Sequence, residues 1–97
     1  MSDSILVRDI VKERREQLGL SQVELGRALG IASGEFLCMV ESGKRHFALD
    51  NIPRLAAVLQ LDPAELCRCA WFEAAPSLYR STFDDSAPQR PKPITNP

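Results

Sequence analysis

Apolar positions recur at helical spacing at the start of the chain. Val7, Val11 and Leu18 are four and seven residues apart, and the positions between them are mainly charged. This is the pattern of an amphipathic helix, which we expect over residues 4–18. Gly19 follows, as glycine commonly does at the C-terminus of a helix.

Four shorter helices are predicted after it. The second covers residues 22–29, where Ser21 and Glu24 have the spacing of a capping box, and the third covers residues 34–41, with Ser33 as its expected N-cap.

The fourth helix is predicted over residues 51–59 with Asp50 as its cap. The fifth begins at Pro63, capped by Asp62, and ends at Glu73 or Ala74. No strand of useful length is apparent, so the pattern predicts an all-α fold.

The chain divides into three parts. Residues 1–75 form the helical domain, residues 76–83 an aromatic extension, and residues 84–97 a tail with four prolines that we expect to be disordered. A chain of 97 residues has room for one domain.

Composition narrows the class of protein. Twelve basic against thirteen acidic residues give a net charge of −1, which argues against a polycation that coats nucleic acid or membrane. The longest apolar runs, such as residues 36–40, are far too short to span a bilayer, and no signal peptide is visible. Three cysteines are too few for a disulfide scaffold, so we expect a reduced, cytoplasmic protein.

The two short helices at about residues 22–41 fit the helix-turn-helix plan, in which the second helix enters the major groove of DNA. The sequence around them resembles the phage-repressor (Cro-like, XRE-type) helix-turn-helix family over roughly residues 7–67. The resemblance rests on the segments GLSQVEL (19–25), LGI (29–31), ESGKR (41–45), LAAVLQL (55–61) and EL (65–66).

This resemblance implies a five-helix, lambda-repressor-like DNA-binding domain. Such proteins regulate transcription in bacteria and phages, usually as homodimers on palindromic operators in double-stranded DNA. It also implies an ion pair between Arg15 and Glu41, and a contact from Gln22 to a DNA phosphate. Lys44 and Arg45 follow the third helix, where cations can contact phosphates. Weaker candidates are Arg14, Arg27, Arg54 and His46.

The third helix departs from the family pattern, because it has one residue more between Gly30 and Glu41 than the commonest form. The base-contacting positions then fall on Gly34, Glu35, Cys38 and Met39, with Ser33 beside them. None of these offers bidentate Arg–guanine or Gln–adenine recognition. Either specificity comes from DNA shape, or the helix has turned from DNA to a protein surface.

The aromatic extension leaves two alternatives open. Its large side chains either cover the helices of their own chain or form a homodimer interface. We expect the interface, formed by Trp71, Phe72, Leu78, Tyr79 and Phe83.

Chemistry at a metal or an active site is not expected. Cys67 and Cys69 are two apart on a helix and point about 200° away from each other. The single histidine and the lack of a nucleophile motif argue against an enzyme, and no cofactor is implied. The alternative function is a protein-interaction module on the same fold, antitoxin-like or an anti-regulator, with a possible partner bound through the tail.

Overall fold

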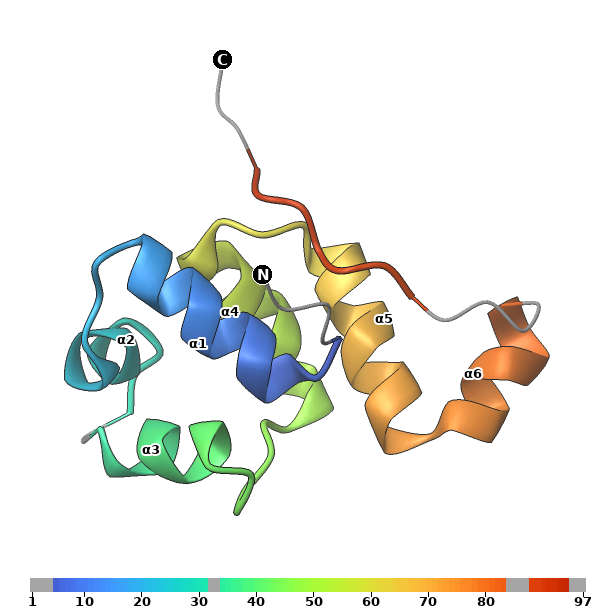
Figure 1. Ribbon diagram of the computed structural model, residues 1–97, viewed down its shortest axis with the longest axis horizontal. Coiled ribbons are helices and arrows are strands. Elements are labelled where there is room, and N and C mark those ends of the chain that lie inside the picture. The colour runs from blue at the N-terminus through green and yellow to red at the C-terminus, as the bar shows by residue number, and fades with distance from the viewer. Residues whose placement is uncertain (1–4, 32–33, 84–87, 95–97) are drawn as a thin grey trace.

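The computed structural model describes residues 5–31, 34–83 and 88–94, and within these ranges the regular structure is helical (Figure 1). The helices are α1 (Val7–Gln17), α2 (Gln22–Ala28), α3 (Glu35–Glu41), a 3-10 turn η1 (Leu49–Asn51), α4 (Ile52–Leu59), α5 (Pro63–Ala74) and α6 (Pro76–Phe83). The predicted all-α fold is confirmed. No helix among the described residues has both the length and the apolar character needed to cross a bilayer.

Local sequence signals set several helix ends. Ser21 Oγ accepts the backbone N–H of Glu24, whose carboxylate accepts that of Ser21, so the predicted capping box is confirmed. Asp62 accepts the N–H groups of Ala64 and Glu65 at the start of α5, also as predicted.

The predicted cap at Asp50 is wrong. The chain enters α4 through the 3-10 turn η1, and Asn51 precedes the helix without a side-chain hydrogen bond. Pro53 lies in the first turn of α4, where its missing N–H leaves no helical bond unmade.

One apolar core holds the helices together. It consists mainly of aliphatic side chains, and those of Val11, Leu25, Leu37, Leu55 and Leu66 are fully buried. They come from α1, α2, α3, α4 and α5, so all five predicted helices contribute to a single core.

The aromatic extension folds as α6 and packs on α5. Tyr79 is buried, and its ring makes edge-to-face contacts with Trp71 at 6.3 Å and with Phe72 at 5.3 Å between centroids. In Figure 1, α6 lies at the end of the molecule opposite α2.

The prediction of a disordered tail is wrong for residues 88–94, which we call the C-terminal strap. The strap runs beside α5 (Figure 1). Its backbone bonds to the α4–α5 connection: Ile94 N–H donates to the Gln60 carbonyl at 2.8 Å, and the Lys92 carbonyl accepts from Asp62 N–H at 3.1 Å. Pro88 and Pro91 are buried. The remaining tail residues, 84–87 and 95–97, lie outside the described residues.

Two contacts that involve side chains also hold the strap against α1 and α5. Arg90 forms an ion pair with Glu13 of α1, and Glu65 accepts the backbone N–H of Lys92 at 3.0 Å. Proline-rich composition predicts disorder when a segment has nothing to bury, whereas here the prolines themselves cover the domain.

Candidate nucleic-acid interface

Helices α2 and α3 are joined by a short connection that begins with a left-handed glycine. Gly30 has φ +79°, and Ile31 N–H donates to the Gly26 carbonyl at 2.7 Å, which closes the end of α2. The connection returns the chain so that Gly34, before α3, lies against the start of α2. A β-carbon at Gly34 would lie 3.0 Å from Val23 Cγ2 and 3.1 Å from the Val23 backbone nitrogen.

A partly buried ion pair links the first and third helices. Arg15 Nε donates to Glu41 Oε2 at 2.8 Å and Nη2 to Oε1 at 3.0 Å, so the structure contains the bidentate pair that the family resemblance implies. The side chains are only 12% and 6% exposed. The hydrogen bonds to Glu41 raise the pKa of Arg15 above its ordinary value, against an opposing effect of burial. The guanidinium of Arg15 therefore stays charged beside Glu41.

Gln22 joins this network. Its Nε2 donates to Glu41 Oε1 at 3.1 Å, while Arg15 Nη1 also donates to the Leu20 carbonyl at 2.9 Å. Helices α1, α2 and α3 are thereby connected around one carboxylate. An amide carries two N–H donors, so the bond to Glu41 orients Gln22 and leaves one donor for another acceptor.

The outer face of α3 is formed by a few of the predicted base-contacting residues. Glu35 and Cys38 are exposed and Met39 is half-buried, whereas Leu37 and Val40 are buried in the core. Gly34 is packed against α2, and Ser33 lies outside the described residues. Across residues 35–41, the exposed face thus carries a carboxylate and a thiol but no cation.

The two expected phosphate-binding cations lie in the loop after α3. Lys44 and Arg45 are exposed, and the guanidinium of Arg45 lies over the Phe36 ring at 5.4 Å from its centroid. Phe36 in turn makes an edge-to-face contact with Phe47 at 5.6 Å. The Phe36 ring, supported by Phe47, therefore places the guanidinium of Arg45 beside α3.

The weaker cation candidates divide into two groups. Arg14 is engaged inside the domain, because its Nε donates to the Leu59 carbonyl at 2.8 Å and ties α1 to α4. Arg27, Arg54 and His46 are exposed.

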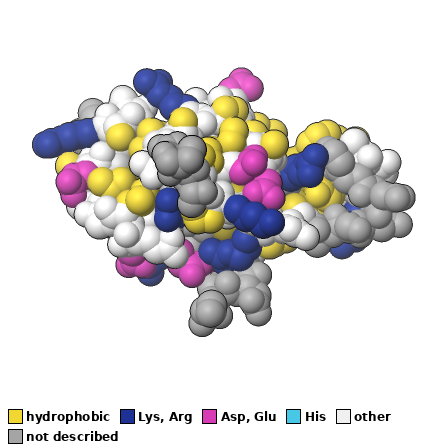
Figure 2. All heavy atoms as spheres, turned by 90° about the horizontal axis from the view of Figure 1, so that it is seen from above, with side chains coloured by type: hydrophobic (Ala, Val, Ile, Leu, Met, Phe, Trp, Pro, Cys, Tyr) yellow, Lys and Arg dark blue, Asp and Glu magenta, His cyan; other side chains and the backbone are white. Residues whose placement is uncertain are grey.

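Opposite α3 lies the face seen from above in Figure 2. Lys and Arg side chains are interspersed there with Asp, Glu and apolar ones, so the described part of this face has mixed charge.

Most of the side chains expected at a dimer interface pack against other residues of the same chain. Tyr79 is buried between α5 and α6, and Trp71 and Phe72 are half-buried against it. Leu78 is 57% exposed and remains accessible, while nothing is described of the Phe83 side chain.

The cysteines do not assemble a metal site in the described part of the chain, where no group of three His, Cys, Asp or Glu side chains comes together. Cys69 is buried under the strap, with its Sγ 3.4 Å from the Gln89 carbonyl. Burial raises the pKa of the Cys69 thiol to about 11. Cys69 is therefore an unreactive core residue rather than a nucleophile.

Comparison with known proteins gives one match. The model of a family described as helix-turn-helix matches residues 11–66, more than half of the chain, from α1 into α5. Neither a curated protein nor a solved structure matches.

Proposed function

Because this chain belongs to the helix-turn-helix family, we propose that it is a bacterial or phage repressor that binds a palindromic operator as a homodimer in the cytoplasm. The family match supports a DNA-binding regulator in general, and the family is typically non-enzymatic. One observation carries the proposal further: the Arg15–Glu41–Gln22 network orients α2 and α3 from inside and leaves the outer face of α3 exposed. An oriented helix with an exposed outer face can enter the major groove.

Affinity in this proposal comes from phosphate contacts around α3. Lys44 and Arg45 are exposed beyond its C-terminus, and Gln22, oriented by Glu41, offers its second amide N–H from α2. Phosphate contacts fix the position of the protein on the duplex but carry no sequence information.

Base recognition in this proposal depends on Glu35, Cys38 and Met39, and Ser33, which lies outside the described residues, is a further candidate. Glu35 can accept a hydrogen bond from cytosine N4, and Met39 or Cys38 can contact a thymine methyl. Gly34 contributes close packing on α2 rather than a side chain. Since these contacts are few, shape and deformability of the operator supply part of the specificity.

Fluorescence anisotropy with the duplex upstream of the gene, beside a scrambled duplex, tests this function. Lys44→Ala and Arg45→Ala should weaken binding to both duplexes and lower the salt slope by about 0.9 for each phosphate that is no longer neutralised. Lys12→Ala is the matched control, because Lys12 is an exposed cation on α1. Unchanged affinity and slope in both loop variants would refute the phosphate assignment.

Sequence preference is measured separately. Glu35→Gln and Met39→Ala should change which duplex is preferred while leaving the salt slope nearly constant, because they alter base contacts rather than phosphate contacts. If neither variant changes the preference, the operator is recognised through its shape.

The second candidate function, a protein-interaction module, is favoured by the outer face of α3, which carries no cation over residues 35–41, and by Val23, which is 45% exposed on α2. A stable heterocomplex in a pull-down, with equal and salt-abolished binding to both duplexes, would support this alternative. A partner that needs the tail would have to bind the strap in place or release it from α5 and α1.

A further inference from the structure

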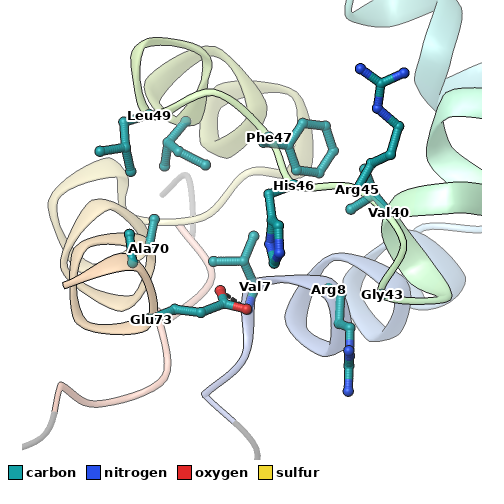
Figure 3. Close-up of a pocket in the computed structure, with 12 residues that line it drawn as sticks. Val7, Arg8, Val40, Gly43, Arg45, His46, Phe47, Leu49, Ala70 and Glu73 are labelled. Carbon is teal, nitrogen blue, oxygen red and sulfur yellow. Dashed lines mark hydrogen bonds between the residues drawn. The ribbon is translucent and has the colours of Figure 1, made fainter. Parts of the chain in front are cut away.

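A pocket of about 420 Å³ opens between the start of α1, the α3–α4 loop and the end of α5. Its volume lies within the roughly 300–1,000 Å³ typical of small-molecule sites. Figure 3 shows the side chains that line it, which come from segments far apart in the sequence.

The floor of the pocket is apolar. Val7, Val40, Ile52 and Ala70 are each at most 6% exposed, and Phe47 adds an aromatic wall. Leu49, which is 55% exposed, forms part of the outer wall. Burial of the apolar part of a ligand against these side chains would favour binding in proportion to the apolar area removed from water.

Charge is divided between two sides of the pocket. The carboxylate of Glu73 lies beside Val7 and accepts the Val7 backbone N–H at 3.3 Å, at the N-terminal end of α1, where the helix dipole favours a negative charge (Figure 3). Arg8 and Arg45 lie on the other side, with their guanidinium groups directed outward, and the His46 ring lies between Val7 and Arg8 (Figure 3).

The cations are therefore at the mouth and the apolar side chains on the floor. The Arg8 side chain lies against the loop, with its Nη1 in the space that a β-carbon on Gly43 would occupy. Arg8 also makes a long ion-pair contact of 3.9 Å with Asp9, and both side chains are well exposed. Such an exposed pair is weak and leaves the guanidinium able to bind another anion.

We propose that this pocket binds small amphipathic carboxylates, with the apolar chain on the floor and the carboxylate at Arg8 and His46. Arg45 at the mouth is also a proposed phosphate contact, whereas Arg8 and the floor residues are not among the proposed DNA contacts, so binding to this pocket is tested without DNA.

Octanoate is the probe, added to the full-length, 15N-labelled chain without DNA. We expect saturable amide shifts centred on Val7, Val40, Ile52 and Ala70. Octanol has the same chain without the charge, octylamine has the opposite charge, and acetate has the charge without the chain. Octanoate should bind about tenfold more tightly than any of the three, because each lacks one of the two interactions.

Two variants on exposed side chains test the two halves of the site. Arg8→Gln should weaken the binding of octanoate about tenfold and leave the affinity for octanol unchanged, whereas Leu49→Ser should weaken the binding of both ligands. Arg27→Gln is the matched control, because Arg27 is exposed on α2 away from the pocket.

Three results would overturn the proposal. They are shifts that do not saturate or that centre outside the pocket, binding of octylamine or octanol equal to that of octanoate, and an Arg8→Gln chain that binds octanoate as the parent does. Circular dichroism of each variant establishes that weaker binding does not result from unfolding.

Discussion

Glycine at position 34 is favoured by the close approach of two helices rather than by its backbone angles. Its φ of −78° suits any residue, but a β-carbon would be 3.0–3.1 Å from both side-chain and backbone atoms of Val23. In a well-packed interface, such an added methyl group forces neighbouring atoms to shift. The sequence pattern placed Gly34 among the base-contacting residues, and the structure assigns it a packing role.

Gly34→Ala should therefore lower the free energy of unfolding by about 1 kcal/mol, the lower end of the cost of overpacking. Val23→Ala in the same chain should restore part of that stability, because it removes Cγ2 but leaves the backbone contact. Urea denaturation of the single and double variants measures both effects. A Gly34→Ala chain as stable as its parent would show that α2 and α3 can separate without cost.

The Arg15–Glu41 ion pair is a contact that residue types alone do not predict. The partners are 26 positions apart, and charge patterning does not pair them. The resemblance to a known family was needed to expect the contact. The third member, the Gln22 amide on Glu41, was not expected, because the resemblance suggested a phosphate as its acceptor.

At the scale of elements, helix limits follow local signals where a cap is present. The Ser21–Glu24 box and Asp62 mark the starts of α2 and α5 within a residue of the prediction. Where no side chain caps the helix, as at α3 and α4, its start follows from packing and from the preceding turn.

The C-terminal strap is an element that the amino-acid composition did not predict. It forms an isolated antiparallel bridge, Leu61 with Pro93, and covers Cys69. A segment without a hydrophobic periodicity can still be ordered when another part of the chain supplies backbone partners for it.

A chain that ends at residue 87 should lose this cover. We expect lower thermal stability and faster alkylation of Cys69, because removal of the strap exposes the thiol and lowers its pKa from about 11 toward the ordinary value. Peptide mapping after iodoacetamide treatment separates Cys69 from Cys67 and from the exposed Cys38.

A chain that ends at residue 94 is the control, since it retains the whole strap. Equal alkylation of Cys69 in the two truncated chains would show that the strap does not protect α5.

At the scale of the whole molecule, the proposed homodimer interface must contain fewer residues than the five expected from the sequence. Tyr79 is buried within its own chain, where it packs α6 on α5. Leu78 is the exposed large apolar side chain of the described part of α6. Two half-sites about 34–36 Å apart require such a surface away from α3. Figure 1 shows α6 at the end of the molecule opposite α2.

Leu78→Glu should therefore shift the chain from dimer to monomer without unfolding it, because the side chain is 57% exposed in one copy. Analytical ultracentrifugation over a range of concentrations measures the shift. Ser77→Glu, an exposed position about 100° around the same helix from Leu78, is the matched control. A Leu78→Glu chain with the parent's dimerisation constant would exclude α6 as the interface.

Local sequence patterns are sufficient to predict the helical class, the succession of α1 to α5 along the chain and the capped helix starts. These depend on contacts within a few residues, so periodicity and capping side chains are sufficient evidence for them. The family resemblance added the ion pair at Glu41 and the general function.

Three features could not be predicted from local patterns: the packing role of Gly34, the docking of the strap on the domain, and the pocket beside the α3–α4 loop. Each depends on atoms that are brought together from separate parts of the chain: Gly34 on Val23, Lys92 on Asp62, and Val7 on Glu73. Burial and hydrogen bonding between such segments are properties of the folded chain, and no local pattern encodes them.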